Sequence, residues 1–125
     1  MQSKSFDQVQ GELFPAGRLT KVIVSPFSDL KAQNFVMGYV TIYPGGSIPL
    51  HTHSQEEVYT VLEGTGQMTV NEETKELSAV SSVYIPPGQP HSLVNHESSN
   101  LIMLFVYAPA GVVDHWAEER EGKLK

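Results

Sequence analysis

Short runs of apolar and β-branched residues recur along most of the chain. They lie at residues 19–24, 35–43, 58–62, 67–70, 82–85, 91–94 and 101–107. Their length and composition are typical of strands rather than helices. Stretches rich in glycine, proline and asparagine separate them and let the chain reverse direction. Many short strands with tight turns and no long helix between them predict a compact all-β domain, an antiparallel sandwich or barrel.

The two ends of the chain depart from this pattern. Residues 1–18 have weak periodicity, and we expect an N-terminal arm that pairs with a strand or lies over another surface. After Gly111, apolar residues recur at intervals of three and four, which predicts a short C-terminal helix over about 112–120. We expect a single domain over residues 1–125, with the barrel at about 35–107, because 125 residues with 40% hydrophobic content suffice for one core.

The strand at 57–62 suggests contact beyond a single barrel. Alternate residues of a strand share a face, so Tyr59 and Val61 lie on the side of Glu57. Val58 and Leu62 lie on the other side, and both faces are therefore partly apolar. We expect the outer face to be covered by a second subunit or by the terminal arm, which favours a homodimer.

Charge and composition exclude several classes of partner. The formal net charge is −6 and the only arginines are Arg18 and Arg120, so no basic stripe is available for nucleic acid. The first ten residues are polar, and no apolar run approaches the roughly 18 residues of a membrane span. We expect a cytoplasmic protein without nucleic-acid or membrane partners. Because the chain has no cysteine, any bound metal must use nitrogen and oxygen ligands.

Two of the five histidines lie one residue apart, in the segment HTHSQEE at 51–57. In a strand, His51 and His53 project to the same side with Cα atoms about 6.6 Å apart, so two imidazoles can converge on one ion. Glu57 continues the parity of His53 in an unbroken strand, whereas Glu56 falls on the opposite face. A bulge at residues 54–55 would upset this count.

A third imidazole follows the Pro-Pro-Gly turn at 86–88. This turn begins a strand at His91, and we expect His91 to supply a nitrogen from across the cavity. Burying these imidazoles with a carboxylate is costly unless all are hydrogen-bonded or share a cation. His96 and His115 are isolated, and we assign neither of them a role.

The spacing of these residues resembles the first signature of the cupin superfamily, which reads here Gly45-x5-His51-x-His53-x3-Glu57-x6-Gly64. The second cupin signature is similar to Pro86-x-Gly88-x2-His91-x3-Asn95, with Val80 in the place of its usual glycine. That departure affects a turn and not a ligand. Together with the flanking strands, the resemblance covers about residues 35–107.

The resemblance implies a jelly-roll β-barrel, often dimeric, with one divalent metal held by His51, His53, Glu57 and His91. Such a ligand set accepts Mn, Fe, Co, Ni, Cu or Zn, and the sequence does not choose among them. In the second motif Asn95 looks structural, closing the turn after its strand. The helix around Trp116 is similar to helices that cover the barrel mouth in some single-domain cupins.

We expect an apolar and aromatic cavity beside the metal. Its lining is drawn from Tyr39 and Tyr43 or their alternates Val40 and Ile42, and from Tyr59, Met68, Met103 and Phe105. Side chains of this kind also simply fill small barrels, so none is assigned a catalytic role. Tyr59 and Gln67 are candidate hydrogen-bond donors to a metal-bound anion. No arginine or lysine lies within the two motifs, so anion binding would rest on the metal.

Three functions fit this site. We favour a metal-dependent enzyme, an oxidoreductase, lyase or isomerase, that binds a small oxygen-rich metabolite at open metal positions and oxidises, decarboxylates or isomerises it. The second is a non-catalytic protein that binds a sugar-like or acidic ligand through the metal. The third is a metal-free barrel kept for dimerisation or scaffolding. No general acid or base can be assigned from the sequence. Cupins carry many different reactions and include non-enzymes, so the resemblance does not identify the reaction.

Overall fold

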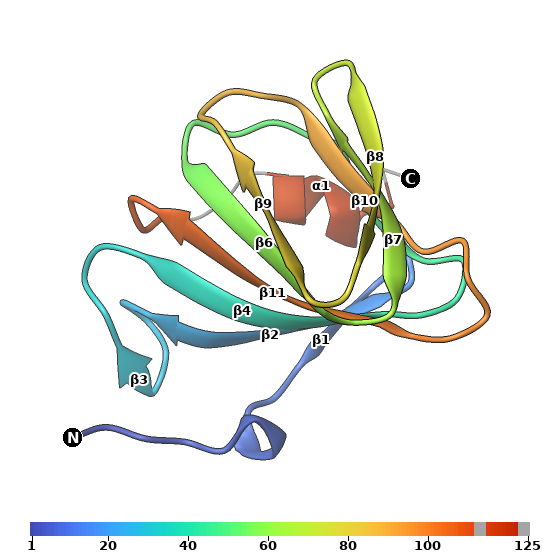
Figure 1. Cartoon of the computed structure of the whole chain (residues 1–125). Coiled ribbons are helices and arrows are strands. Elements are labelled where there is room, and N and C mark those ends of the chain that lie inside the picture. Colours follow the sequence, from blue (N-terminus) through green and yellow to red (C-terminus); the bar gives the residue numbers. More distant parts are fainter. Residues whose placement is uncertain (112–114, 123–125) are drawn as a thin grey trace.

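A computed structural model describes residues 1–111 and 115–122 as two β-sheets that face each other (Figure 1). The seven-stranded sheet contains β1 (Glu12–Phe14), β2 (Arg18–Ser25), β3 (Leu30–Lys31), β4 (Val36–Ile42), β6 (Glu56–Glu63), β9 (Ser81–Ile85) and β11 (Leu101–Ala108). The four-stranded sheet contains β5 (Ser47–His51), β7 (Thr65–Val70), β8 (Glu73–Ser78) and β10 (His91–Val94). Two short helices, η1 (Phe6–Gln8) and α1 (His115–Arg120), complete the described elements.

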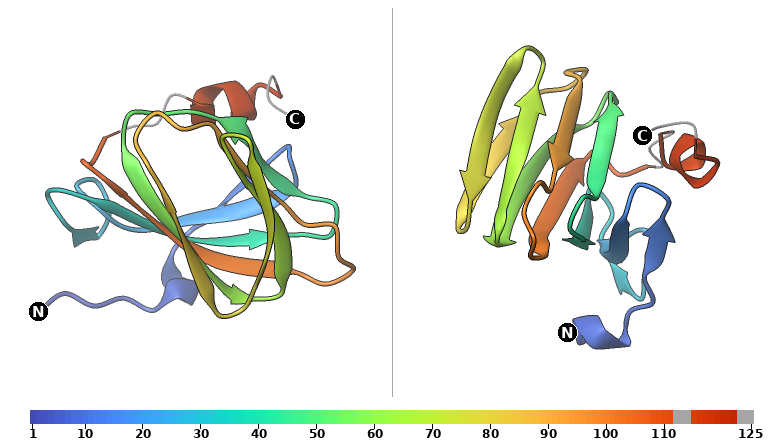
Figure 2. Two further views of the ribbon diagram at one scale, coloured as in Figure 1. Left: turned by 45° about the horizontal axis from the view of Figure 1, so that its top comes forward. Right: turned by 90° about the vertical axis from the view of Figure 1, so that its right-hand side faces the viewer.

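The strand order is that of a jelly roll. The larger sheet runs β1-β2-β4-β11-β6-β9, with β3 pairing parallel to β2, and the smaller sheet runs β5-β10-β7-β8. All other pairings are antiparallel among the described residues. The two sheets enclose an open-ended barrel, seen along different directions in Figure 2. The predicted all-β fold is therefore confirmed.

Every strand predicted from the apolar runs is present, and four more are added. β8 has the sequence ETKELS, with Leu77 as its one buried residue, so it lacks the apolar pattern of a strand. β5 contains Pro49, which argues against a strand in sequence reasoning. β1 and β3 have three and two residues, too few to show a period.

Strict alternation places one face of β4 and β11 in the core. Val40, Ile42 and Phe105 are buried, whereas Tyr43 is 37% exposed, so the valine and isoleucine alternates of the predicted lining point inward. Gly38 lies opposite Phe105 in the ladder, and a Cβ at Gly38 would come 2.1 Å from the phenyl ring. The absence of a side chain at Gly38 thus creates the space for Phe105.

The N-terminal arm lies against its own barrel. β1 pairs antiparallel with β2, and the Phe6 ring of η1 contacts the Tyr39 ring edge-on at a centroid distance of 5.3 Å. Lys21 donates a hydrogen bond from Nζ to the carbonyl of Phe6 at 3.0 Å. The strand pairing expected for the arm is thus found within the chain.

The predicted C-terminal helix is observed as α1 over His115–Arg120, while residues 112–114 of the prediction lie outside the described residues. α1 lies beside β1 and β5 on one side of the barrel (Figure 2). Its Trp116 contacts Phe14 and Phe105, with ring centroids 6.3 and 6.1 Å apart. Within the described chain, no helix has the length and apolar character needed to cross a bilayer.

Candidate metal centre

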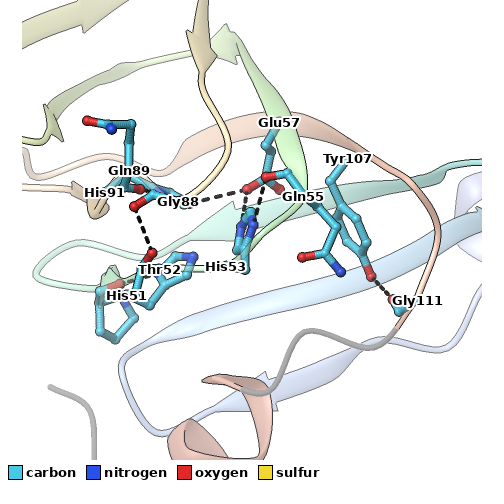
Figure 3. Close-up of polar contacts among 11 residues, drawn as sticks. His51, Thr52, His53, Gln55, Glu57, Gly88, Gln89, His91, Tyr107 and Gly111 are labelled. Carbon is cyan, nitrogen blue, oxygen red and sulfur yellow. Dashed lines mark hydrogen bonds and ion pairs between the residues drawn. The ribbon is translucent and has the colours of Figure 1, made fainter.

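Four side chains, from three strands and one connection, converge inside the barrel (Figure 3). His51 ends β5, His91 begins β10, Glu57 lies in β6, and His53 lies in the connection between β5 and β6. One donor atom from each lies within 4.8 Å of the others. The structure therefore brings together all four residues predicted from the motifs.

His91 lies directly opposite His51 in the β5–β10 ladder, and their ring centroids are 4.1 Å apart. The expectation that His91 reaches in from across the cavity is therefore wrong, because both histidines stand on the same sheet. Glu57 is the donor from the opposite side, on β6 of the seven-stranded sheet. The cluster thus joins the two sheets.

The chain from His51 to Glu57 is interrupted, as the alternative of a bulge at 54–55 allowed, since β5 ends at His51 and β6 begins at Glu56. His53 is instead positioned by the neighbouring turn at 86–88. Its carbonyl accepts a hydrogen bond of 2.8 Å from the Gly88 amide, and Thr52 Oγ1 donates to the Gly88 carbonyl at 3.1 Å. Gly88 adopts φ +75°, a conformation that glycine takes without strain, so this turn requires glycine.

Each of the three imidazoles is oriented by a main-chain carbonyl. Nδ1 of His51 lies 2.6 Å from the carbonyl of Pro49, and Nδ1 of His91 lies 2.8 Å from that of Gln89. Nδ1 of His53 lies 3.0 Å from the carbonyl of Gln55. A carbonyl can only accept, so the proton is on Nδ1 and the Nε2 lone pair of a neutral ring points inward. Metal-bound histidines are commonly oriented by such bonds.

Glu57 Oε1 faces two of these rings at once. It lies 2.9 Å from His53 Nε2 and 3.2 Å from His91 Nε2. Burial alone would raise the pKa of the Glu57 carboxyl, but the hydrogen bonds and charges of His53 and His91 outweigh it, and the net pKa is lowered. The carboxylate is therefore ionised and cannot donate to either ring. Without a cation, both rings would have to be imidazolium ions beside a single oxygen.

A cation resolves this conflict, because neutral Nε2 atoms and a carboxylate are all ligands. Adjacent ligands about 2.1 Å from an octahedral ion lie about 3.0 Å apart, and opposite ones about 4.2 Å. The 2.9 and 3.2 Å separations match adjacent ligands, and the 4.8 Å limit of the cluster is close to the larger value. The donor set therefore fits a divalent transition metal, whose identity it leaves open.

Three of the four donors, His51, His53 and Glu57, line a cavity with about 20 Å³ of free space. Its lining is Arg18, Thr20, Val40, Ile48, His51, His53, Glu57, Tyr59, Phe105, Tyr107 and Trp116. Met68 and Met103, which were expected to line it, are buried in the core instead. Gln67, a candidate donor to a metal-bound anion, is instead exposed and lies 2.9 Å from His96 Nε2.

Two tyrosines in the lining remain protonated at neutral pH. Burial, and then the charge of Glu57, raise the pKa of Tyr59 well above its ordinary value and that of Tyr107 to about 12. Tyr107 donates its hydroxyl proton to the carbonyl of Gly111 at 2.6 Å. Both phenols are therefore hydrogen-bond donors rather than bases.

Sequence reasoning missed Arg18, which supplies a cation to the cavity wall. Arg18 Nη2 donates to Glu119 Oε1 at 2.8 Å, and Nη1 donates to Oε2 of the same carboxylate. The expectation that the site has no cation beside the metal is therefore corrected. Arg18 lies outside both motifs, in a segment that was expected to be an arm, and its partner is 101 positions away. No local signal connects the two.

The remaining predictions around the cluster agree with the structure. Glu56 points outward and accepts a hydrogen bond of 2.9 Å from the Tyr84 hydroxyl. Asn95 is fully buried, and its Nδ2 donates to the carbonyls of Ile42 and Ser99 at 2.9 Å each. This is the structural role expected for it. The side chain of His115 lies outside the described part of the chain.

The fold and this cluster define a small cupin, and comparison with known proteins agrees. The cupin domain model matches residues 38–107, so the chain belongs to the cupin domain family. An uncharacterised protein of Streptomyces coelicolor is 34% identical over 80 residues, which is 64% of this chain and 75% of the relative.

Solved structures share the fold at low identity. A predicted oxalate decarboxylase from Thermotoga maritima superposes with a TM-score of 0.78 at 19% identity, over 86% of this chain and 99% of that one. The polyketide cyclase RemF from Streptomyces resistomycificus gives 0.74 at 21% identity, over 96% and 89%. At these identities the likeness establishes the architecture and not the reaction.

Proposed function

We propose that this cupin is a metal-dependent enzyme that acts on a small oxygen-rich metabolite by oxidation, decarboxylation or isomerisation. The observation that carries the proposal is the pairing of one ionised carboxylate oxygen, on Glu57, with the Nε2 atoms of His53 and His91. His51 completes the set. A bound divalent ion would supply Lewis-acid or redox chemistry at its open positions.

The chain's own residues would orient the ligand beside that ion. Tyr59 offers its hydroxyl proton to an oxygen atom of a substrate, whereas Tyr107 would first have to release the carbonyl of Gly111. Phe105 and Trp116 provide an apolar wall. With both tyrosines protonated, they act as hydrogen-bond donors and not as bases. This favours substrates that arrive as anions and accept hydrogen bonds.

The first test is metal analysis of the purified protein, followed by incubation with oxalate under air, with CO₂ and formate release measured. Oxalate is the first choice because a structural neighbour is described as a predicted oxalate decarboxylase. We expect about one ion per chain and loss of turnover after chelation. A panel of small hydroxy- and oxo-acids follows, with consumption monitored by NMR. A folded, metal-free protein would contradict the proposal.

A non-catalytic binding protein for an acidic or sugar-like ligand is the second candidate. It is favoured by the small free volume of the cavity, about 20 Å³, and by the lack of a base beyond the metal donors in its described lining. Saturable binding of an acid with no consumption of any member of the panel would select this alternative.

We also propose a cytoplasmic homodimer. Val106, Val58 and Tyr84 are neighbours across β11, β6 and β9, and Val106 and Tyr84 are 36% and 54% exposed. This row supports burial against a second copy. Sedimentation of the wild type and of Val106→Lys tests it, with Leu50→Lys, an exposed leucine on the other sheet, as the control. A wild-type monomer would contradict the dimer, and fractionation of the source cells tests the location.

A further inference from the structure

A buried ion pair forms part of the wall of the metal cavity. Arg18 is 2% exposed and Glu119 is 1% exposed, and the guanidinium meets the carboxylate through two parallel hydrogen bonds. Arg18 also lies over the Phe14 ring at 4.2 Å. Arg18 lines the same cavity as His51 and Glu57. A cation therefore faces the space beside the proposed metal.

Thr20 provides a second donor next to Arg18. The two residues are two positions apart on β2, and both line the cavity. Thr20 is 5% exposed, and its hydroxyl has no hydrogen-bond partner among the described residues. Leaving such a group unpaired in a buried place costs free energy, so native structures usually provide a partner. A ligand oxygen beside Arg18 would be that partner.

The cavity is too small for a metabolite in the observed arrangement. Free space of about 20 Å³ holds about one water molecule. Glu119, which pairs with Arg18, and Trp116, which lines the cavity, both belong to α1, a helix of six residues. α1 is also held by the ring contacts of Trp116 with Phe14 and Phe105 and by the exposed pair of Arg120 with Glu12. A shift of this one helix would release both side chains together.

We propose that Arg18 and Thr20 form the binding site for a carboxylate group of the ligand, and that Glu119 of α1 occupies this site until the ligand exchanges with it. The inference deepens the proposed function, since the other end of the ligand would reach the metal. A carboxylate is specified because the planar guanidinium fork already holds one in the same geometry.

The test uses the full-length, metal-loaded protein with malonate as the probe, measured by calorimetry and thermal melting. Glu119→Gln removes the internal competitor. If an internal side chain occupies a site more than about nine-tenths of the time, removing that side chain raises the apparent affinity for the ligand about tenfold or more. We therefore expect Glu119→Gln to bind malonate about tenfold more tightly than the wild type. Malonate should also raise the melting temperature of this variant more than that of the wild type.

The double variant Arg18→Gln/Glu119→Gln keeps an uncharged, hydrogen-bonding pair and avoids a lone buried charge. We expect it to fold and to bind no malonate. Thr20→Val should weaken malonate binding without lowering the melting temperature, because it removes an unpaired hydroxyl. Glu118→Gln, an exposed position on the same helix, serves as the control and should behave like the wild type.

Two outcomes would overturn the assignment of Arg18 and Thr20 as a carboxylate site. One is that the double variant binds malonate as tightly as Glu119→Gln does. The other is that Glu119→Gln and the wild type bind malonate equally well. Inorganic phosphate binding Glu119→Gln as tightly as malonate would overturn the choice of carboxylate. The same titrations in chelator separate this inference from the proposed function. If no variant holds metal, the difference in malonate affinity between Glu119→Gln and the double variant still decides the role of Arg18.

Discussion

His51 and His91 form a directly opposed pair in the antiparallel ladder between β5 and β10, with ring centroids 4.1 Å apart. Opposed residues in a ladder are held at a fixed separation by the backbone bonds on either side. The relative position of His51 and His91 is therefore set by strand register. The position of Glu57 relative to them depends on how the two sheets are placed.

Replacing a histidine of the cluster should remove most of the bound metal. His51→Ala and His91→Ala each delete a donor, so we expect the metal affinity to fall by more than the roughly 10–100-fold that follows loss of a supporting partner. Elemental analysis after dialysis measures the effect. His96→Ala is the control, since His96 contacts the exposed Gln67. Equal metal content in all three variants would refute the ligand assignment.

Acid should weaken the metal-free barrel through Glu57. Its pKa is lowered from 4.5, so its stabilisation is fully present above that ordinary value and is lost as pH falls through the lower value of the folded state. We expect Glu57→Gln to reduce the free energy of unfolding more at pH 5.5 than at pH 3. Urea titrations in chelator test this. A loss of unfolding free energy in Glu57→Gln that is larger at pH 3 than at pH 5.5 would contradict the prediction.

Acid should also release the metal itself. A ligating imidazole must be unprotonated, and a free imidazole titrates near pH 6.5, so we expect metal loss as pH falls through and below about 6. Dialysis at stepped pH followed by elemental analysis measures it. An ion that stays bound at pH 4 after long equilibration would indicate a different ligand set.

Gly38→Ala should destabilise the barrel and disturb the cavity wall. The new methyl group would overlap the Phe105 ring, and overpacking of this kind costs about 1–3 kcal/mol. Chemical denaturation measures the loss. Adding Phe105→Leu should recover part of it, because the smaller side chain makes room. A double variant less stable than the sum of both single changes would contradict this packing.

Asn95→Ala should lower stability without lowering metal affinity. It removes a donor to the buried carbonyl of Ile42, at about 1–3 kcal/mol for a buried group left unpaired, and also the bonds to the Ser99 carbonyl and the Glu97 amide. Asn100→Ala, at an exposed position, is the control. A loss of metal affinity as large as that in His91→Ala would show that Asn95 belongs to the site.

The sequence was most informative where short-range geometry decides the structure. The apolar runs at 35–43 and 101–107 predicted β4 and β11, in which alternate residues are buried. The motif spacing predicted the cluster correctly although it left the path of the chain open: His53 and Glu57 meet through a bend and not along a strand. The Arg18–Glu119 pair was not predicted, because it depends on where α1 packs against β2.

The position of the cluster between the sheets has a consequence for local opening. A cation bound there would be a cross-link between β5 and β10 on one sheet and β6 on the other. Amide hydrogens in these three strands would then exchange with solvent more slowly, and together, once the ion is added. β8, at the far edge of the smaller sheet, would keep its exchange rate.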